Sequence, residues 1–178
     1  MRFVVLFTAL NFSLSFLGQA LPSSWMGSYK GEMFLYSSGS TPFDSISVVL
    51  QIEEMVKDSI WRYKMMYGAP ESPSYLVKDY RIVLNQNGFS MDEGQGIIIP
   101  MKRFGDCLID FYSVEEQDSF FMSSILCVLP NGDIEFRLFG GSLKPDKIKS
   151  INNVEESFDL KTYVLGFNQI ALLKKENK

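Results

Sequence analysis

The sequence predicts an all-β domain, a single antiparallel meander of about 8–10 strands that closes into a β-barrel. Apolar and polar residues alternate in runs of five to twelve residues, and Gly, Pro, Asn, Asp and Ser separate the runs. No long segment has helical spacing. Closing the sheet removes the two unpaired edges that an open sheet would expose. A two-sheet β-sandwich explains the same alternation and remains the alternative.

The first element is an apolar leader, residues 1–20. Arg2 supplies a positive charge, an apolar run covers residues 3–17, and Gly18 and Ala20 place small residues at a cleavage site. This pattern predicts a secretory signal peptide cleaved after Ala20. The run is shorter than the roughly 20 residues of a membrane span, and a retained anchor is the alternative. We therefore expect a secreted or periplasmic protein with one domain, residues 21–178, and no membrane span after cleavage.

Eleven runs within residues 21–178 have the period of half-buried strands. They cover residues 25–36, 46–52, 59–67, 77–85, 88–92, 97–103, 107–113, 119–129, 133–140, 157–165 and 170–175. Some of these runs are expected to be parts of one bent strand, so the predicted number of strands is about ten. A barrel of this size is wide enough for one small ligand.

Alternation also predicts which side chains face the interior. Trp61, Tyr63 and Met65 share one side of their strand, with Arg62 and Lys64 on the other. In the run that follows, the apolar face contains Tyr80, Ile82 and Leu84. No inward-facing Arg or Lys stands out, so an anionic group held deep inside would lack a counter-charge. We expect an uncharged or amphipathic ligand whose polar end lies at the mouth.

Two predicted hairpins set the register in the middle of the chain. A hairpin centred on Gln117 places Cys107 opposite Cys127, and a two-residue Asn131-Gly132 loop places Phe136 opposite Cys127. One face is then predicted to be interior and the opposite face, with Asp110, Glu135 and Arg137, to be exterior. The predicted interior face comprises Cys107, Ile109, Phe111, Ile125, Cys127, Phe136 and Leu138.

The opposed cysteines, Cys107 and Cys127, make a disulfide candidate in an exported protein, and two buried thiols are the alternative. The chain contains no histidine. This excludes Ser-His-Asp and Cys-His catalytic arrangements and His-ligated zinc. The paired acids are expected to be solvated loop residues, so we predict no catalytic residue, no metal site and no cofactor. Basic residues are scattered, which argues against a nucleic-acid partner.

The first predicted strand places Trp25, Gly27, Tyr29 and Gly31 on alternate positions. This pattern resembles the first-strand signature of the calycin group, in which lipocalins have Gly-x-Trp and nitrobindins Gly-x-Trp-x-Gly. Either Trp25-Met26-Gly27 matches Trp-x-Gly, or Gly27-Ser28-Tyr29 takes the place of Gly-x-Trp. The resemblance implies a barrel and a ligand carrier of no particular ligand. The haem-ligating histidine of nitrobindin and the helical pair of fatty-acid-binding proteins are both missing.

The predicted function is binding of a small apolar or amphipathic ligand inside the barrel. The candidate ligand-binding residues are Trp61, Tyr63, Met65, Tyr80, Phe111 and Phe136. The four residues of the first strand have a structural role instead: the glycines relieve crowding while Trp25 and Tyr29 plug the closed end. The alternative is a protein- or glycan-interaction module with a packed core. The sequence predicts no oligomeric state.

Overall fold

The computed structural model describes residues 20–37, 39–115, 119–152 and 157–176. Apart from Ala20, the predicted leader lies outside the described residues. One short 3-10 helix, η1 (Ser23–Trp25), precedes the strands of the described chain. The strands are β1 (Gly27–Tyr36), β2 (Asp44–Val56), β3 (Ile60–Tyr67), β4 (Leu76–Asn85), β5 (Gly88–Gly94), β6 (Ile97–Phe104), β7 (Cys107–Asp110), β8 (Tyr112–Val114), β9 (Phe120–Val128), β10 (Ile134–Ser142), β11 (Lys147–Asn152), β12 (Ser157–Thr162) and β13 (Phe167–Lys175).

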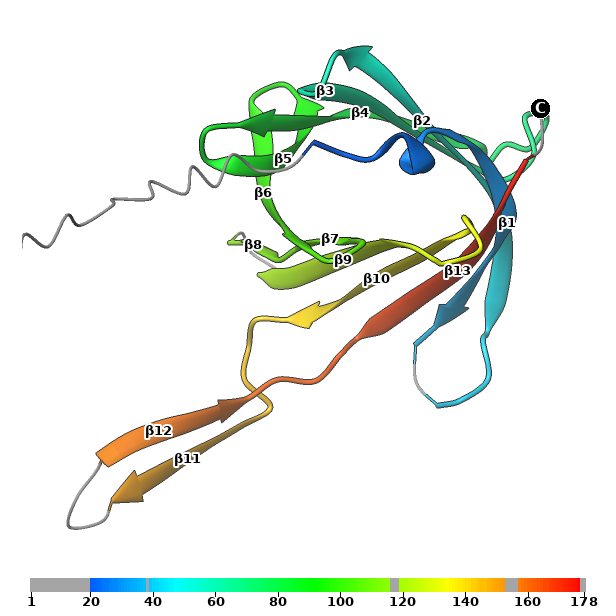
Figure 1. Cartoon of the computed structure of the whole chain (residues 1–178). Helices are drawn as coiled ribbons and strands as arrows, with labels where there is room; N and C mark the ends of the chain where they lie inside the picture. Colours follow the sequence, from blue (N-terminus) through cyan, green and yellow to red (C-terminus); the bar gives the residue numbers. More distant parts are fainter. Residues whose placement is uncertain (1–19, 38, 116–118, 153–156, 177–178) are drawn as a thin grey trace, which may run out of the picture.

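Ten of these strands form a closed antiparallel barrel (Figure 1). Each strand pairs with the next along the chain from β1 to β7, and the order then continues through β9, β10 and β13. Closure follows because β13 pairs with both β10 and β1. The short strand β8 continues the line of β7 beside β9 after an interruption at Phe111. The predicted all-β closed meander is confirmed, and the sandwich alternative is wrong.

The remaining strands, β11 and β12, form a separate hairpin, which we call the arm. The arm is inserted between β10 and β13 and projects away from the barrel (Figure 1). The sequence predicted a strand over 157–165 but none over 147–152. That segment, Lys-Ile-Lys-Ser-Ile-Asn, is short and mostly polar, so its alternation is too brief to be recognised.

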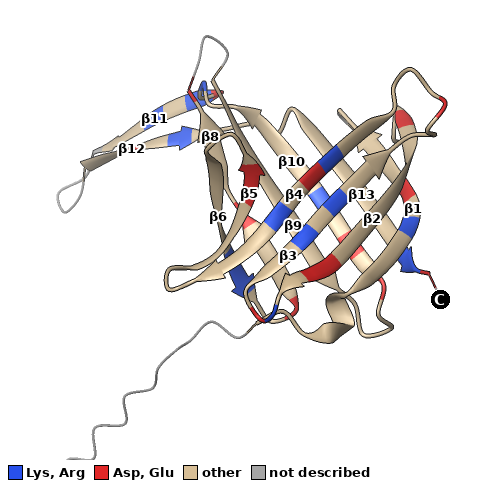
Figure 2. Ribbon diagram, turned by 90° about the horizontal axis from the view of Figure 1, so that it is seen from above, with Lys and Arg blue, Asp and Glu red and all other residues tan. Residues whose placement is uncertain are grey.

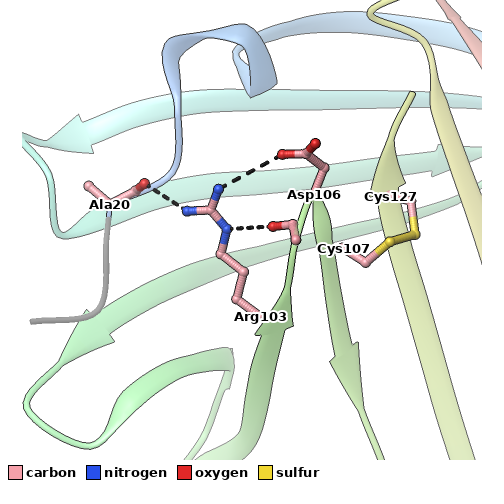
Figure 3. A network of polar contacts seen from close by, with 6 residues as sticks. Ala20, Arg103, Asp106, Cys107 and Cys127 are labelled. Carbon is pink, nitrogen blue, oxygen red and sulfur yellow. Dashed lines mark hydrogen bonds and ion pairs between the residues drawn. A yellow bond between two sulfur atoms is a disulfide. The ribbon is translucent and has the colours of Figure 1, made fainter. Parts of the chain in front are cut away.

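The disulfide candidate is confirmed on the outside of the barrel. Cys107 lies directly opposite Cys127 in the β7–β9 pair, as the predicted register requires, and their sulfur atoms are bonded at 2.05 Å. The bond joins two neighbouring strands of the sheet wall (Figure 3).

The predicted register of β10 is wrong by one residue. Leu129 pairs with Asp133 through a 2.8 Å backbone hydrogen bond, so the loop contains Pro130, Asn131 and Gly132 rather than two residues. Gly132 has φ +86°, as a three-residue hairpin loop requires of its last residue. Cys127 consequently faces Glu135, and Phe136 faces Leu126. A one-residue slip moves every side chain to the other face of the sheet.

The predicted interior face of β7 and β9 is therefore also wrong. Leu108 and Leu126 are buried inside, whereas Phe111 is outside and 68% exposed. Both faces of these strands are rich in apolar residues, because the outer face has its own aromatic contacts. Phe111 stacks on Phe121 with 5.9 Å between ring centroids. Asp110 was predicted to face outward, but it lies on the inner face, whereas Phe136 and Leu138 face inward as expected.

The aromatic residues at the start of the chain pack at one end of the barrel, which we call the closed end. Trp25 and Tyr29 are fully buried, and the Tyr29 hydroxyl donates to the backbone oxygen of Trp25 at 2.9 Å. A Cβ at Gly31 would come within 2.3 Å of the Leu172 oxygen, so this glycine permits the close approach of β1 and β13. Arg103 donates to the oxygen of Ala20 at 3.2 Å and so ties the incoming chain to β6 (Figure 3).

The outer face of the barrel is charged, as predicted. Figure 2 shows bands of opposite charge side by side on β2, β3 and β4. Arg62 on β3 lies opposite Glu53 and donates to Asp79 at 2.8 Å, and Arg81 donates to Asp92 at 2.7 Å. These cross-strand pairs keep the outer surface of the barrel polar while the opposite face of each strand is packed inside.

Candidate functional site

A small cavity of about 60 Å³ lies at the end of the barrel opposite Trp25, which we call the open end. The direction of β3 gives this position. Trp61, near the start of β3, packs in the core near the closed end of the barrel, and Tyr67, the last residue of β3, lines the cavity. Side chains from seven strands of the barrel wall and from β8 line the cavity. They are Tyr63, Tyr67, Lys78, Tyr80, Met91, Glu93, Ile99, Asp110, Tyr112, Met122, Ser124, Phe136 and Leu138.

Three of the six predicted ligand-binding residues line this cavity: Tyr63, Tyr80 and Phe136. Trp61 and Met65 do face the interior, but they are fully buried in the packed core and do not line the cavity. Phe111 lies on the outer surface, so its predicted interior position is wrong. The structure thus brings half of the predicted site together and places it toward the open end.

Four tyrosines give the cavity its chemical character. Tyr63 and Tyr80 are direct cross-strand neighbours on the inner face of β3 and β4, and Tyr67 and Tyr112 lie nearer the rim. The Tyr63 hydroxyl contacts the Met65 sulfur at 3.9 Å and the Tyr112 hydroxyl the Met122 sulfur at 3.5 Å. Sulfur is a weak acceptor. These hydroxyls therefore keep hydrogen-bonding capacity for another molecule in the cavity.

All four phenol groups stay protonated near neutral pH. Burial raises the pKa of Tyr63 and Tyr67 well above the ordinary value, and it raises the pKa of Tyr112 to about 12. The pKa of Tyr80 is also raised, first by burial and then by the neighbouring Glu93 carboxylate. The site thus presents neutral O–H groups and ring faces rather than phenolate charge.

Glu93 lies on the inner face of β5. Phe89 and Met91, four and two residues earlier, are buried in the core, so the alternation of the strand places Glu93 on the same side. Asp92, between Met91 and Glu93, points outward to Arg81. The β5–β6 register shifts between Asp92 and Gly94, so Glu93 lies at a β-bulge. The inner face of β5 thus brings a carboxylate beside Tyr80.

Asp110 brings a second carboxylate into the cavity from β7. Only 6% of this residue is exposed, and it accepts a 2.8 Å hydrogen bond from the Ser124 backbone N–H and another from the Ser124 hydroxyl. Burial raises the pKa of Asp110, and the two hydrogen bonds from Ser124 partly offset that effect. A buried carboxylate is held here at the expense of its hydration.

Lys78 corrects the expectation that no lysine faces inward. It lies on the same face of β4 as Tyr80 and lines the cavity, with its Nζ atom 5.9 Å from the Tyr80 ring centroid. Strict alternation from Tyr80 would have found it. Alternation from Trp61 identifies Tyr67 in the same way, and alternation from Met91 identifies Glu93.

The cavity is small compared with the roughly 300–1,000 Å³ of pockets for drug-sized ligands. The rest of the interior is filled by the core, so a large apolar ligand does not fit in this conformation. A hollow of about 910 Å³ lies beside the closed end, between the ends of β1, β2 and β13. There the side chain of Lys175 already donates to Ser24, so fewer free polar groups converge.

Two kinds of site are not found in the part of the chain that the structure describes. No group of three or more His, Cys, Asp or Glu residues there could hold a metal ion. No helix among the described residues is long and apolar enough to cross a membrane.

The comparisons with known proteins give no family for this chain. No protein-family model matches the sequence, and no curated protein matches it. The closed antiparallel barrel is compatible with a calycin-like fold, and a fold alone does not specify a function.

Proposed function

We propose that this protein is an exported lipocalin-like barrel that binds a small amphipathic ligand in the cavity at its open end. The observation that carries the proposal is the convergence of neutral and charged polar groups from several strands on one cavity in an otherwise packed barrel. Concave sites of this kind, mostly apolar with a few placed polar groups, are typical of ligand pockets.

The two sides of the cavity suit an amphipathic molecule. Met91, Ile99 and Phe136 provide apolar surface toward the core, and Tyr80 and Glu93 provide polar groups toward the rim. The small volume restricts the enclosed part of the ligand to a few non-hydrogen atoms. Support for export comes from the Cys107–Cys127 disulfide, since such bonds persist in oxidising compartments, and from the predicted leader.

Native mass spectrometry of the protein purified from an exporting cell tests this proposal. We expect a mass addition on the wild-type chain that is lost in Leu138→Trp, because a larger ring at this position fills the cavity. Leu172→Trp is the matched control, since Leu172 is exposed on the outer side of β13. A mass addition that Leu138→Trp retains, or none on the wild type, contradicts the proposal. The measured mass of the intact protein should also equal that of a chain that begins at Leu21.

A second candidate function is an interaction module, and the arm is the observation that favours it. Ile148, Phe158 and Leu160 are exposed on the arm, which projects from the barrel as an isolated two-stranded hairpin (Figure 1). Such hairpins are marginally stable alone. Each free edge can pair with the same edge of a second copy of this chain.

Sedimentation velocity tests this second candidate. A wild-type dimer whose population rises with concentration, and its loss in Phe158→Ser/Leu160→Ser, would support it. Both substitutions lie on the arm, away from the barrel core. A wild-type protein that stays monomeric at its highest soluble concentration would rule out a second copy as the partner.

A further inference from the structure

We propose that the ligand group held at the open end is a small organic ammonium ion, such as a protonated primary amine. This inference rests on the proposed function and adds the chemical class of the ligand. The carboxylates, ring faces and hydroxyl groups that meet in the cavity support this ligand class.

The charge of the lining favours a cation. Glu93 and Asp110 both line the cavity, and neither takes part in the ion pairs formed among the described residues. Asp110 is more than nine-tenths buried, where an uncompensated carboxylate is costly. Lys78 is the one cation of the described lining, so the formal charge of these three groups is negative. A bound ammonium ion would neutralise that charge.

The rings of Tyr63, Tyr67, Tyr80 and Tyr112 add a second attraction. An ammonium group within about 6 Å of a tyrosine ring centroid is attracted by the negative face of the ring. The chain already shows this preference at the rim, where the Lys78 ammonium lies 5.9 Å from the Tyr80 ring. Lys78 thus acts as an internal example of the proposed ligand and as its competitor.

The hydroxyl groups supply acceptors for the N–H donors of an ammonium ion. Tyr63 is only 6% exposed, and its hydroxyl group contacts the Met65 sulfur at 3.9 Å. The Tyr112 hydroxyl group contacts the Met122 sulfur. In both contacts the hydroxyl group donates, so neither contact uses its acceptor lone pairs. An ammonium carries three donors and no acceptor, which complements this arrangement.

Three probes of equal length test the charge of the ligand: propylammonium, 1-propanol and propanoate. Each is titrated into the full exported chain and followed by amide chemical shifts on β3, β4, β5 and β7. We expect propylammonium to bind best. Glu93→Gln should weaken its binding about tenfold, since a hydrogen bond to a charged group contributes about 1.5 kcal/mol or more. Asp110→Asn should act in the same direction.

Two further variants make the test specific. Glu135→Gln removes the same charge from the outer face of β10, beside Phe136, and should change the affinity less than twofold. Lys78→Met should strengthen propylammonium binding, because it removes a competing cation, and should weaken any propanoate binding.

The possible outcomes separate this inference from the proposed function. Equal binding of 1-propanol and propylammonium at the open end, or tighter binding of propanoate, overturns the ammonium inference but leaves a ligand site in place. An equal loss of affinity in Glu93→Gln and Glu135→Gln overturns it as well. If none of the three probes shifts amides around the cavity, both the inference and the proposed function fail.

Discussion

The two ends of the barrel use tyrosine in opposite ways. At the closed end, the Tyr29 hydroxyl lies 2.9 Å from the Trp25 oxygen and 3.2 Å from the Ser24 oxygen. At the open end, the hydroxyl groups of Tyr63 and Tyr112 contact methionine sulfurs. A satisfied hydroxyl fixes structure, whereas a poorly satisfied one in a cavity is available to a ligand. The difference supports a structural role for the closed end and agrees with the binding proposed for the open end.

The largest expected effect lies at the closed end. Trp25→Ala removes a fully buried ring from the core and should lower the free energy of unfolding by about 3–5 kcal/mol. Chemical denaturation measures this change. Phe43→Ala is the control, because Phe43 is 66% exposed and its loss should change stability by about 0.5 kcal/mol or less. Similar losses in the two variants would show that Trp25 is not a structural plug.

The disulfide is expected to have the next largest effect. Cys107→Ser/Cys127→Ser should lower the free energy of unfolding by about 3 kcal/mol, because the bond closes a loop of 20 residues. Wild-type protein in reducing agent should unfold at the same denaturant concentration as the double variant without it. Two free thiols in the oxidised wild-type protein, detected by a thiol reagent, would contradict the bond.

Removing single hydroxyl groups compares the two ends directly. Tyr29→Phe should lower the free energy of unfolding by about 1 kcal/mol, because a buried hydrogen bond to a backbone oxygen is lost. Tyr112→Phe should change it by about 0.5 kcal/mol or less, since its partner is a sulfur. Urea midpoints measure both changes. An equal loss in the two variants would remove the distinction between the ends.

The smallest effect is a pH-dependent gain at the open end. Because burial raises the pKa of Asp110 in the folded protein, folding becomes less favourable as pH rises from the unfolded value of 3.8 through the raised folded value. Asp110→Asn should therefore be slightly more stable than the wild type at neutral pH, and this difference should vanish below the unfolded pKa. Thermal unfolding at a series of pH values measures it. A loss of stability at neutral pH would contradict this account.

Sequence reasoning succeeded where the two faces of a strand differ strongly. On β3, Trp61, Tyr63 and Met65 alternate with Arg62 and Lys64, and their assigned faces were right. On β7 and β9 both faces are apolar, because Phe111 and Phe121 pack against each other outside. In such strands, alternation does not show which face points into the barrel.

The rest of the candidate site depended on local backbone details. Pro130 belongs to the hairpin loop, and this single residue shifts the register of the whole β9–β10 pair. Glu93 follows the alternation of β5 from Met91, but it was excluded by the expectation that paired acids are solvated loop residues. Lys78 follows the alternation of β4 but was excluded by the expectation that charges face outward. Such inward charges are the exceptions expected at functional sites.

The most direct test of ligand binding at the open end is a crystal structure of the protein as purified from an exporting cell, at a resolution that shows ordered water. The account predicts density for a small molecule in the cavity, in contact with the Glu93 carboxylate and the Tyr80 ring, while the core around Trp25 stays dry. A cavity filled by Met91, Met122 and Leu138 alone, with Glu93 turned out to solvent, would contradict it.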